Sequence, residues 1–180
     1  MRQIEKYPYA VVRCALKYSA LVFCRPGEIR KAEWKEIDWE KKEWRLPKEK
    51  MKPKVPHIVP LANQTVEVLL ELKKYTGDSN WLFPSARSDG RCMSENAVRV
   101  ALRSMGITNE EMCPHGFRAM ASTTLYDNGF ESLHIERQLS HVERNKVIKA
   151  YNHAEYLPQR REMMQWYADW LDNLKKQVSD

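Results

Sequence analysis

Long apolar runs are missing from this 180-residue sequence. A helix needs roughly 18 or more consecutive apolar residues to cross a bilayer, and no segment approaches that length. The first residues, Met1 to Lys6, also lack the apolar stretch of a secretory signal peptide. The sequence therefore predicts a cytoplasmic protein without a membrane partner.

Cysteine is scarce, with four residues and no Cys-x-x-C pair. Cys113 and His115 are the only cysteine and histidine close together, and a zinc site needs further ligands that the pattern does not supply. Reduced structural thiols are the simpler interpretation. We therefore predict neither a metal site nor another cofactor.

Positive charge is in modest excess. Thirty Lys and Arg residues against twenty-four Asp and Glu give a net charge of +6 and an isoelectric point near 9.1. This balance suits a polyanionic partner such as nucleic acid, although many basic proteins bind none. The length suits one packed domain, and no linker, repeat or low-complexity tract divides it, so we expect a single domain over residues 1–180.

Apolar spacing and turn residues indicate mostly helical structure. Apolar residues recur at helical spacing over 9–23, and Pro26 suits the first turn of a short following helix. Further helices are expected over 63–77, 94–102, 114–128, 131–139, 144–151 and from Pro158 onward. Three short strands are expected over 37–39, 43–46 and 57–61, with a lysine-rich loop over 47–56. The prediction is a mainly α fold with a small three-stranded antiparallel sheet.

Four short strings carry the functional signal. In chain order they are Arg25-Pro26-Gly27-Glu28, His115-x-x-Arg118, Leu139-Ser140-His141, and Tyr151. Arginine presents a planar fork of donors that matches phosphate oxygens and stays charged. A tyrosine hydroxyl becomes a useful nucleophile when cationic donors hold the phosphate and the developing phenolate. The set therefore predicts phosphate chemistry at a tyrosine.

In this order the strings resemble the catalytic domain of tyrosine recombinases, the phage integrase family, and most of all the branch carried by prophages and genomic islands. The resemblance runs from about residue 8 to about residue 171. It implies the tyrosine-recombinase catalytic-domain fold and attack by Tyr151 on a DNA phosphodiester. The products are a 3′-phosphotyrosyl link and a free 5′-hydroxyl. Strand exchange and rejoining then follow without metal or ATP.

The resemblance also assigns roles to the other residues. Arg25 and Arg118 clamp the phosphate, and Glu28 orients an arginine. His115 is the expected base for the phenol proton, and His141 the expected hydrogen-bond donor to the phosphate. These are the residue types that can stabilise charge on non-bridging oxygens.

The leaving 5′-oxygen needs a proton, which a hairpin lysine provides in this family. Lys52 matches that position best. Many members follow this lysine with threonine, whereas Pro53 stands here, so Lys54 stays as a rival. Tyr156 and Tyr167 are rivals for the nucleophile, because both also lie downstream of His141.

The resemblance implies double-stranded DNA of attachment-site type as the partner, and self-association into a tetrameric synapse in the full-length protein. A bacterial or phage-derived protein located at the nucleoid is expected. The DNA-gripping domains of full-length integrases are expected to lie outside these 180 residues. The aromatic last helix fits either the core or a partner-binding face.

Two other functions stay open. A strand-relaxing enzyme of the type IB topoisomerase kind would use the same chemistry. A non-catalytic DNA-binding or assembly module could retain the motif, although here no charged or nucleophilic member of the set is missing.

Overall fold

The computed structural model describes residues 1–141 and 155–177. The helices are α1 (Arg2–Glu5), α2 (Ala10–Val22), α3 (Pro26–Ile29), α4 (Asn63–Thr76), α5 (Ala97–Ser104), α6 (Gly116–Asp127), α7 (Ser132–Gln138) and α9 (Leu157–Gln177). The strands are β1 (Ile37–Asp38), β2 (Glu43–Leu46) and β3 (His57–Pro60), and short 3₁₀ turns cover Trp34–Glu36 and Lys48–Lys50. The predicted fold class, mainly α with a small three-stranded antiparallel sheet, is confirmed.

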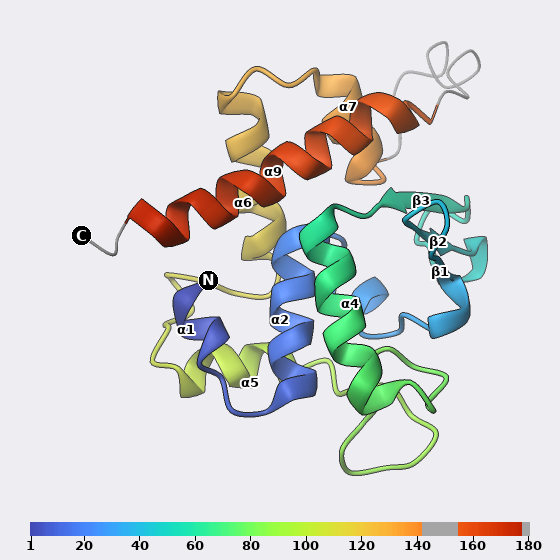
Figure 1. The fold of residues 1–180 in the computed structure, drawn as a ribbon, viewed down its shortest axis with the longest axis vertical. Helices are drawn as coiled ribbons and strands as arrows, with labels where there is room; N and C mark the ends of the chain where they lie inside the picture. The colour runs from blue at the N-terminus through green and yellow to red at the C-terminus, as the bar shows by residue number, and fades with distance from the viewer. Residues whose placement is uncertain (142–154, 178–180) are drawn as a thin grey trace.

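Helix α2 lies at the centre and runs alongside α4 (Figure 1). Its predicted apolar face is buried, with Ala15, Tyr18 and Val22 inaccessible to solvent. The Tyr18 ring meets the buried Trp44 ring edge-on at 5.6 Å, which joins α2 to the sheet. The end of α2 is therefore fixed on two sides, and Arg25 follows it three residues later.

Helix α9 crosses the molecule and contacts α2, α4, α6, α7 and β3 (Figure 1). Met163, Tyr167 and Leu171 of this helix are buried, whereas Leu174 is 40% exposed. The face that could have served a partner is thus used mainly for the core of the same chain. This packing favours the core interpretation of the terminal aromatic residues.

The sheet follows the order β1-β2-β3, with Trp44 paired to Val59 and Leu46 to His57. Residues 47–56 connect β2 to β3, and Lys50 anchors this loop. Its ammonium group lies 2.6 Å from a Glu33 carboxylate oxygen. The loop therefore has a fixed base from which the next lysines project.

Some sequence predictions differ from the structure in detail. Helix α5 begins at Ala97 with Asn96 as its N-cap, and the Ser94 hydroxyl accepts a hydrogen bond from the Asn96 N–H at 3.3 Å. The helix thus begins three residues after the predicted start at Ser94, and Ser94 stabilises the turn before it. The short α1 was not predicted, because four residues carry too little periodic signal. The predicted helix over 144–151 lies outside the described residues.

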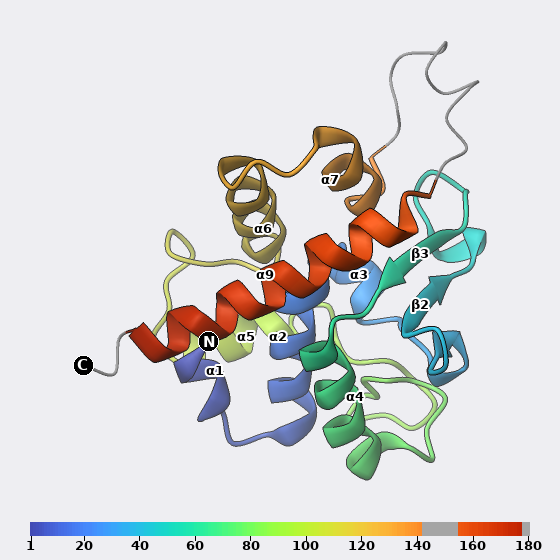
Figure 2. The ribbon, with the colours of Figure 1, turned by 45° about the horizontal axis from the view of Figure 1, so that its top comes forward.

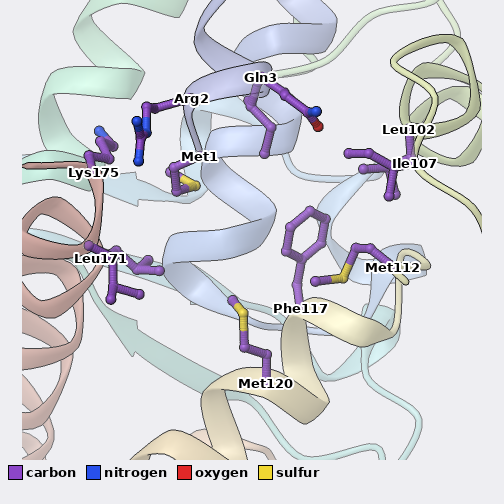
Figure 3. Close-up of a pocket in the computed structure, with 12 residues that line it drawn as sticks. Met1, Arg2, Gln3, Leu102, Ile107, Met112, Phe117, Met120, Leu171 and Lys175 are labelled. Atoms are coloured by element: carbon purple, nitrogen blue, oxygen red, sulfur yellow. The ribbon is translucent and has the colours of Figure 1, made fainter. Parts of the chain in front are cut away.

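A cavity of about 380 Å³ lies among α1, α5, α6 and α9 (Figure 3). Its lining is mostly apolar and includes Leu102, Met112, Phe117 and Leu171. The described residues that line it include no predicted site residue. In the described part of the chain, no helix combines the length and the apolar character needed to span a membrane.

Candidate active site

Arg25 is the N-cap of α3 and is held by Glu28 three residues later. One Glu28 carboxylate oxygen accepts from the Arg25 backbone N–H at 3.0 Å, and the other accepts from Arg25 Nη1 at 2.9 Å. The Glu28 side chain is 6% exposed and that of Arg25 is 26% exposed. A buried carboxylate thus fixes one edge of a guanidinium group whose side chain is still partly exposed.

Arg118 comes from the first turn of α6 and reaches the same region. Its Nη1 donates to the Phe23 carbonyl at 3.2 Å, and its Nη2 donates to the Leu139 carbonyl. Burial lowers the pKa of Arg118, and the positive charge of Arg25 acts in the same direction. Two cations are therefore held close together in a partly desolvated place, which favours binding of an anion.

Both arginines meet at the Leu139-Ser140-His141 string. Arg25 Nη2 donates to the Ser140 carbonyl at 3.2 Å, next to the Leu139 carbonyl that Arg118 contacts. The structure thus brings together three strings that are separated by up to 115 positions in the chain. These carbonyls occupy guanidinium donors that a phosphate could use.

Two residues beside the site adopt left-handed backbone conformations, Phe23 with φ 40° and Ser140 with φ 51°. Such conformations cost about 1 kcal/mol or more for residues other than glycine. Their carbonyls are the ones that accept from Arg118 and Arg25, respectively. The strained backbone therefore directs two acceptors toward the two guanidinium groups.

His141 is oriented by a carboxylate that sequence reasoning missed. Its Nδ1 lies 2.6 Å from Glu136 Oε2, and the Tyr126 hydroxyl donates to Glu136 Oε1 at 2.9 Å. Since a carboxylate only accepts, the pairing favours the proton on Nδ1 and leaves Nε2 free for another partner. The only available signal was an acidic residue five positions before His141, which is a weak pattern.

His115 is the N-cap of α6, and its side chain is exposed. Its carbonyl accepts from the backbone N–H of Arg118 at 3.1 Å, so the two residues share one turn. The backbone therefore places this imidazole at the end of the helix that supplies Arg118. Its predicted role as a base stays a prediction.

Lys52 and Lys54 are both exposed in a turn in which the Lys54 N–H donates to the Met51 carbonyl at 3.1 Å. Within the described residues, neither ammonium group contacts Arg25 or Arg118. The structure does not separate these two rivals. Lys50, by contrast, is committed to Glu33 and Glu36 at 2.6 and 2.5 Å.

Tyr151 lies outside the described residues, so its position relative to the arginines stays a prediction. Of its two rivals, Tyr167 is fully buried, and burial raises the pKa of its hydroxyl. The Tyr156 ring is half-buried against the His134 ring at 5.1 Å. A buried phenol cannot reach a phosphodiester, which argues against Tyr167.

His57 at the start of β3 is buried and links the sheet to α7. Its Nε2 lies 3.1 Å from the Gln138 carbonyl, and burial together with the nearby Arg160 charge lowers its pKa to about 3. The imidazole is therefore neutral in the folded protein at neutral pH. His57 belongs to none of the four strings, and a structural role fits its buried position.

We expect His57 to make stability depend on pH. In the unfolded chain its pKa returns to about 6.5, so below that pH the unfolded state binds the extra proton. The free energy of unfolding should then fall as the pH drops from about 6.5 toward about 3. The slope from this group is at most about 1.4 kcal/mol per pH unit.

Urea unfolding of wild type and His57→Gln between pH 7 and pH 4.5 measures this effect. Glutamine can still donate to the Gln138 carbonyl but does not titrate, so its curve should be flatter. If both proteins lose stability in parallel, the proton is not excluded from His57 in the folded state.

In the ranges 1–141 and 155–177, no three His, Cys, Asp or Glu side chains gather in a way that could hold a metal ion. The Cys24 thiol lies beside Arg25 and is buried, and burial raises its pKa. It therefore packs behind the arginines as a neutral group.

Comparison with known proteins places the chain among integrases. It is 46% identical over 185 residues to an integrase of Enterobacteria phage P4, covering 94% of this chain and 42% of that protein. It is 39% identical over 157 residues to the prophage integrase IntA of Escherichia coli K12, covering 87% of this chain and 38% of that protein. The chain thus spans less than half the length of these two relatives.

Solved structures show the same fold at low identity. One is the XerH site-specific recombinase bound to its difH substrate, with a TM-score of 0.62 and 16% identity over 83% of this chain and 49% of that chain. Another is a lambda integrase tetramer bound to a Holliday junction, with a TM-score of 0.59 and 17% identity over 80% of this chain and 44% of that chain. The predicted tyrosine-recombinase catalytic-domain fold is confirmed.

A sequence model described as the phage integrase family matches residues 3–158, which is most of the chain. This range contains all four strings, and the two relatives come from a phage and a prophage. The predicted family and branch are both confirmed. The chain belongs to the phage integrase family.

Proposed function

We propose that the chain is the catalytic domain of a site-specific DNA recombinase that cleaves and rejoins DNA through Tyr151. The observation that carries the proposal is the convergence of Arg25 and Arg118 on the carbonyls just before His141. Two guanidinium groups next to an imidazole form a cationic site suited to a phosphodiester. Family membership supplies the expected nucleophile, ten positions after His141.

In the proposed cleavage step, the Tyr151 oxygen attacks phosphorus and forms the new ester bond. The bond from phosphorus to the 5′-oxygen breaks, and its electron pair leaves with that oxygen. His115 accepts the phenol proton, and Lys52 donates a proton to the departing 5′-oxygen. Rejoining is the reverse step, in which a 5′-hydroxyl attacks the phosphotyrosine.

The two arginines and His141 would stabilise the charge on the non-bridging oxygens during this step. Arg25 and Arg118 would exchange their contacts with the Ser140 and Leu139 carbonyls for contacts with phosphate. Glu136 would hold the His141 ring through Nδ1, which leaves Nε2 as the proposed donor to the phosphate. Because two guanidinium groups and the His141 imidazole would surround the phosphate, the proposed reaction needs no divalent ion for charge stabilisation.

Double-stranded DNA of attachment-site type is the proposed substrate. The net charge of +6 supports a polyanionic partner. The two solved neighbours are named for a recombinase with its substrate and a tetramer on a Holliday junction, which supports DNA binding and self-association. The comparisons favour neither a strand-relaxing enzyme nor a non-catalytic module. We also propose that residues 1–180 form one catalytic domain.

A covalent adduct on nicked suicide DNA tests this function. The 180-residue protein is incubated in EDTA with a duplex whose short cleaved fragment diffuses away, and the products are separated in denaturing detergent. We expect a protein–DNA adduct at the 3′ end. No adduct, or one that forms only with added magnesium, would exclude the proposed chemistry.

The same assay separates Lys52 from Lys54. We expect Lys52→Ala to cleave an ordinary strand slowly and to recover with a 5′-bridging phosphorothiolate, because a thiolate leaves without a proton. Lys54→Ala should mainly weaken DNA binding, with an effect that changes with salt concentration, as for a phosphate contact. Recovery of Lys54→Ala alone would exchange the two roles.

A further inference from the structure

Arg160 is the only fully buried cation among the described residues, with 0% of its side chain exposed. It lies in the first turn of α9, where α9, α7 and β3 come together at one end of the molecule (Figure 2). The proposed mechanism does not use it, and no sequence motif drew attention to it. A buried charge of this kind needs a physical explanation.

The guanidinium group of Arg160 joins three segments of the chain. Its Nη2 donates to the Ile58 carbonyl of β3 at 2.5 Å and to Gln138 Oε1 of α7 at 2.6 Å. Its Nη1 donates to the Glu155 carbonyl at 3.1 Å. A planar fork satisfies these acceptors at once, whereas the single ammonium group of a lysine could not reach all of them.

Each of these segments continues into a proposed catalytic group. Ile58 lies six residues after Lys52, and Gln138 lies three residues before His141. Glu155 lies four residues after Tyr151 in the sequence. One side chain therefore contacts the segments that carry Lys52 and His141, together with the described residue that lies nearest to Tyr151 on its C-terminal side.

Neighbouring contacts reinforce this junction. The Gln138 carbonyl meets His57 Nε2 at 3.1 Å, and the Gln138 side-chain nitrogen donates to the Val22 carbonyl at 3.5 Å. The Glu155 carboxylate also pairs with Arg137 of α7, with 3.2 Å between Arg137 Nε and Oε2. The junction thus reaches α2, three residues before Arg25, as well as the sheet.

Stability alone explains Arg160 poorly. Burying a charge is unfavourable, and apolar replacements of buried ionic groups often leave stability unchanged or improve it. An arginine retained at full burial, with its donors spread over three segments, is better explained by geometry. Reaction rates fall steeply when reacting groups are misplaced by about 1 Å.

We propose that Arg160 is a positioning residue that keeps the lysine loop, the His141 turn and the end of the Tyr151 segment in register for cleavage. This inference rests on the proposed function. Arg160 does not touch the substrate. It acts through the backbone of β3, the side chain of Gln138 and the backbone of Glu155.

Arg160→Lys tests the inference, with Arg161→Lys as the matched control. Arg161 is the next residue on α9 and donates to the Lys41 carbonyl at 2.7 Å and to Glu43, not to Ile58, Gln138 or Glu155. We measure unfolding, DNA affinity and the cleavage rate at a temperature where every variant is folded. Ordinary and 5′-bridging phosphorothiolate strands are compared.

We expect Arg160→Lys to cleave the ordinary strand about 10- to 100-fold more slowly, with DNA affinity nearly unchanged. The phosphorothiolate should recover part of the rate, because that substrate no longer needs a well-placed Lys52. A purely structural role would not produce this substrate-dependent recovery. Arg161→Lys should cleave at the wild-type rate.

Several results would overturn the inference. One is that folded Arg160→Lys cleaves at the wild-type rate while Tyr151→Phe is inactive. This result would reject the positioning role of Arg160 and keep the proposed function. Another is an equal loss in Arg161→Lys, which would mean that any weakening of α9 suffices. A wild-type protein without an adduct rejects the proposed function and the inference together. If Arg160→Lys unfolds, Arg160→Met, which fills the space without charge, is assayed against the same expectations.

Discussion

Replacing Tyr151 with phenylalanine should abolish the covalent DNA adduct while leaving the fold and the non-covalent DNA affinity intact. The change removes one oxygen, which is the proposed nucleophile, and keeps the aromatic ring. Without that oxygen no ester to phosphorus can form, however well the arginines hold the phosphate. Adduct formation on nicked suicide DNA, together with a binding assay, measures both quantities.

Tyr156→Phe is the matched control, because Tyr156 is the nearest other tyrosine and its ring lies 5.1 Å from that of His134. We expect this variant to form the adduct. Peptide mapping of the wild-type adduct should identify the peptide that contains Tyr151. If Tyr156→Phe is inactive and Tyr151→Phe still reacts, the assignment of the nucleophile is wrong.

The fold could be predicted because its main elements have local signals. The apolar spacing of α2, the Pro26 after Arg25, and the short strands around Trp44 each depend on residues that are close in sequence. The Arg25–Glu28 contact also follows from sequence, because a carboxylate at the third position of a short helix can reach the N-cap.

The rest of the site depends on contacts that no local pattern reports. Arg118 reaches Phe23 across 95 positions, and Arg160 reaches Ile58 across 102. The acceptors are backbone carbonyls, which every residue carries, so the sequence offers no reason to prefer Leu139 or Ser140. Tertiary packing decides which carbonyl faces which guanidinium group, and for this reason Glu136, Gln138 and Arg160 were missed.

The residue before His141 illustrates the same limit. Ser140 adopts a φ of 51°, which glycine would reach without steric strain. A serine gives no local signal for this conformation, so the backbone angle and its role in directing the Ser140 carbonyl come only from the structure.

Arg25→Lys and Arg118→Lys should each slow cleavage by about 2–4 kcal/mol, or roughly 30- to 1,000-fold, as for other preorganised donors to a transition state. Lysine keeps the positive charge, so DNA affinity should change much less than the cleavage rate. The loss is expected because a lysine cannot donate to two acceptors in the fixed plane of a guanidinium fork. In Arg118 that fork now spans the Phe23 and Leu139 carbonyls.

Arg30→Lys serves as the control, since Arg30 lies at the other end of α3 and donates to the Met93 carbonyl at 3.4 Å, away from His141. It should cleave at close to the wild-type rate. Single-turnover cleavage at saturating protein separates the chemical step from binding.

Near wild-type cleavage by both Arg25→Lys and Arg118→Lys would mean that the two guanidinium groups only hold the His141 turn. A loss confined to binding would place them at the DNA backbone and outside the reaction centre. The convergence on adjacent carbonyls predicts neither of these results but a large loss in the chemical step for each variant, because one phosphate can replace both carbonyls as the shared acceptor.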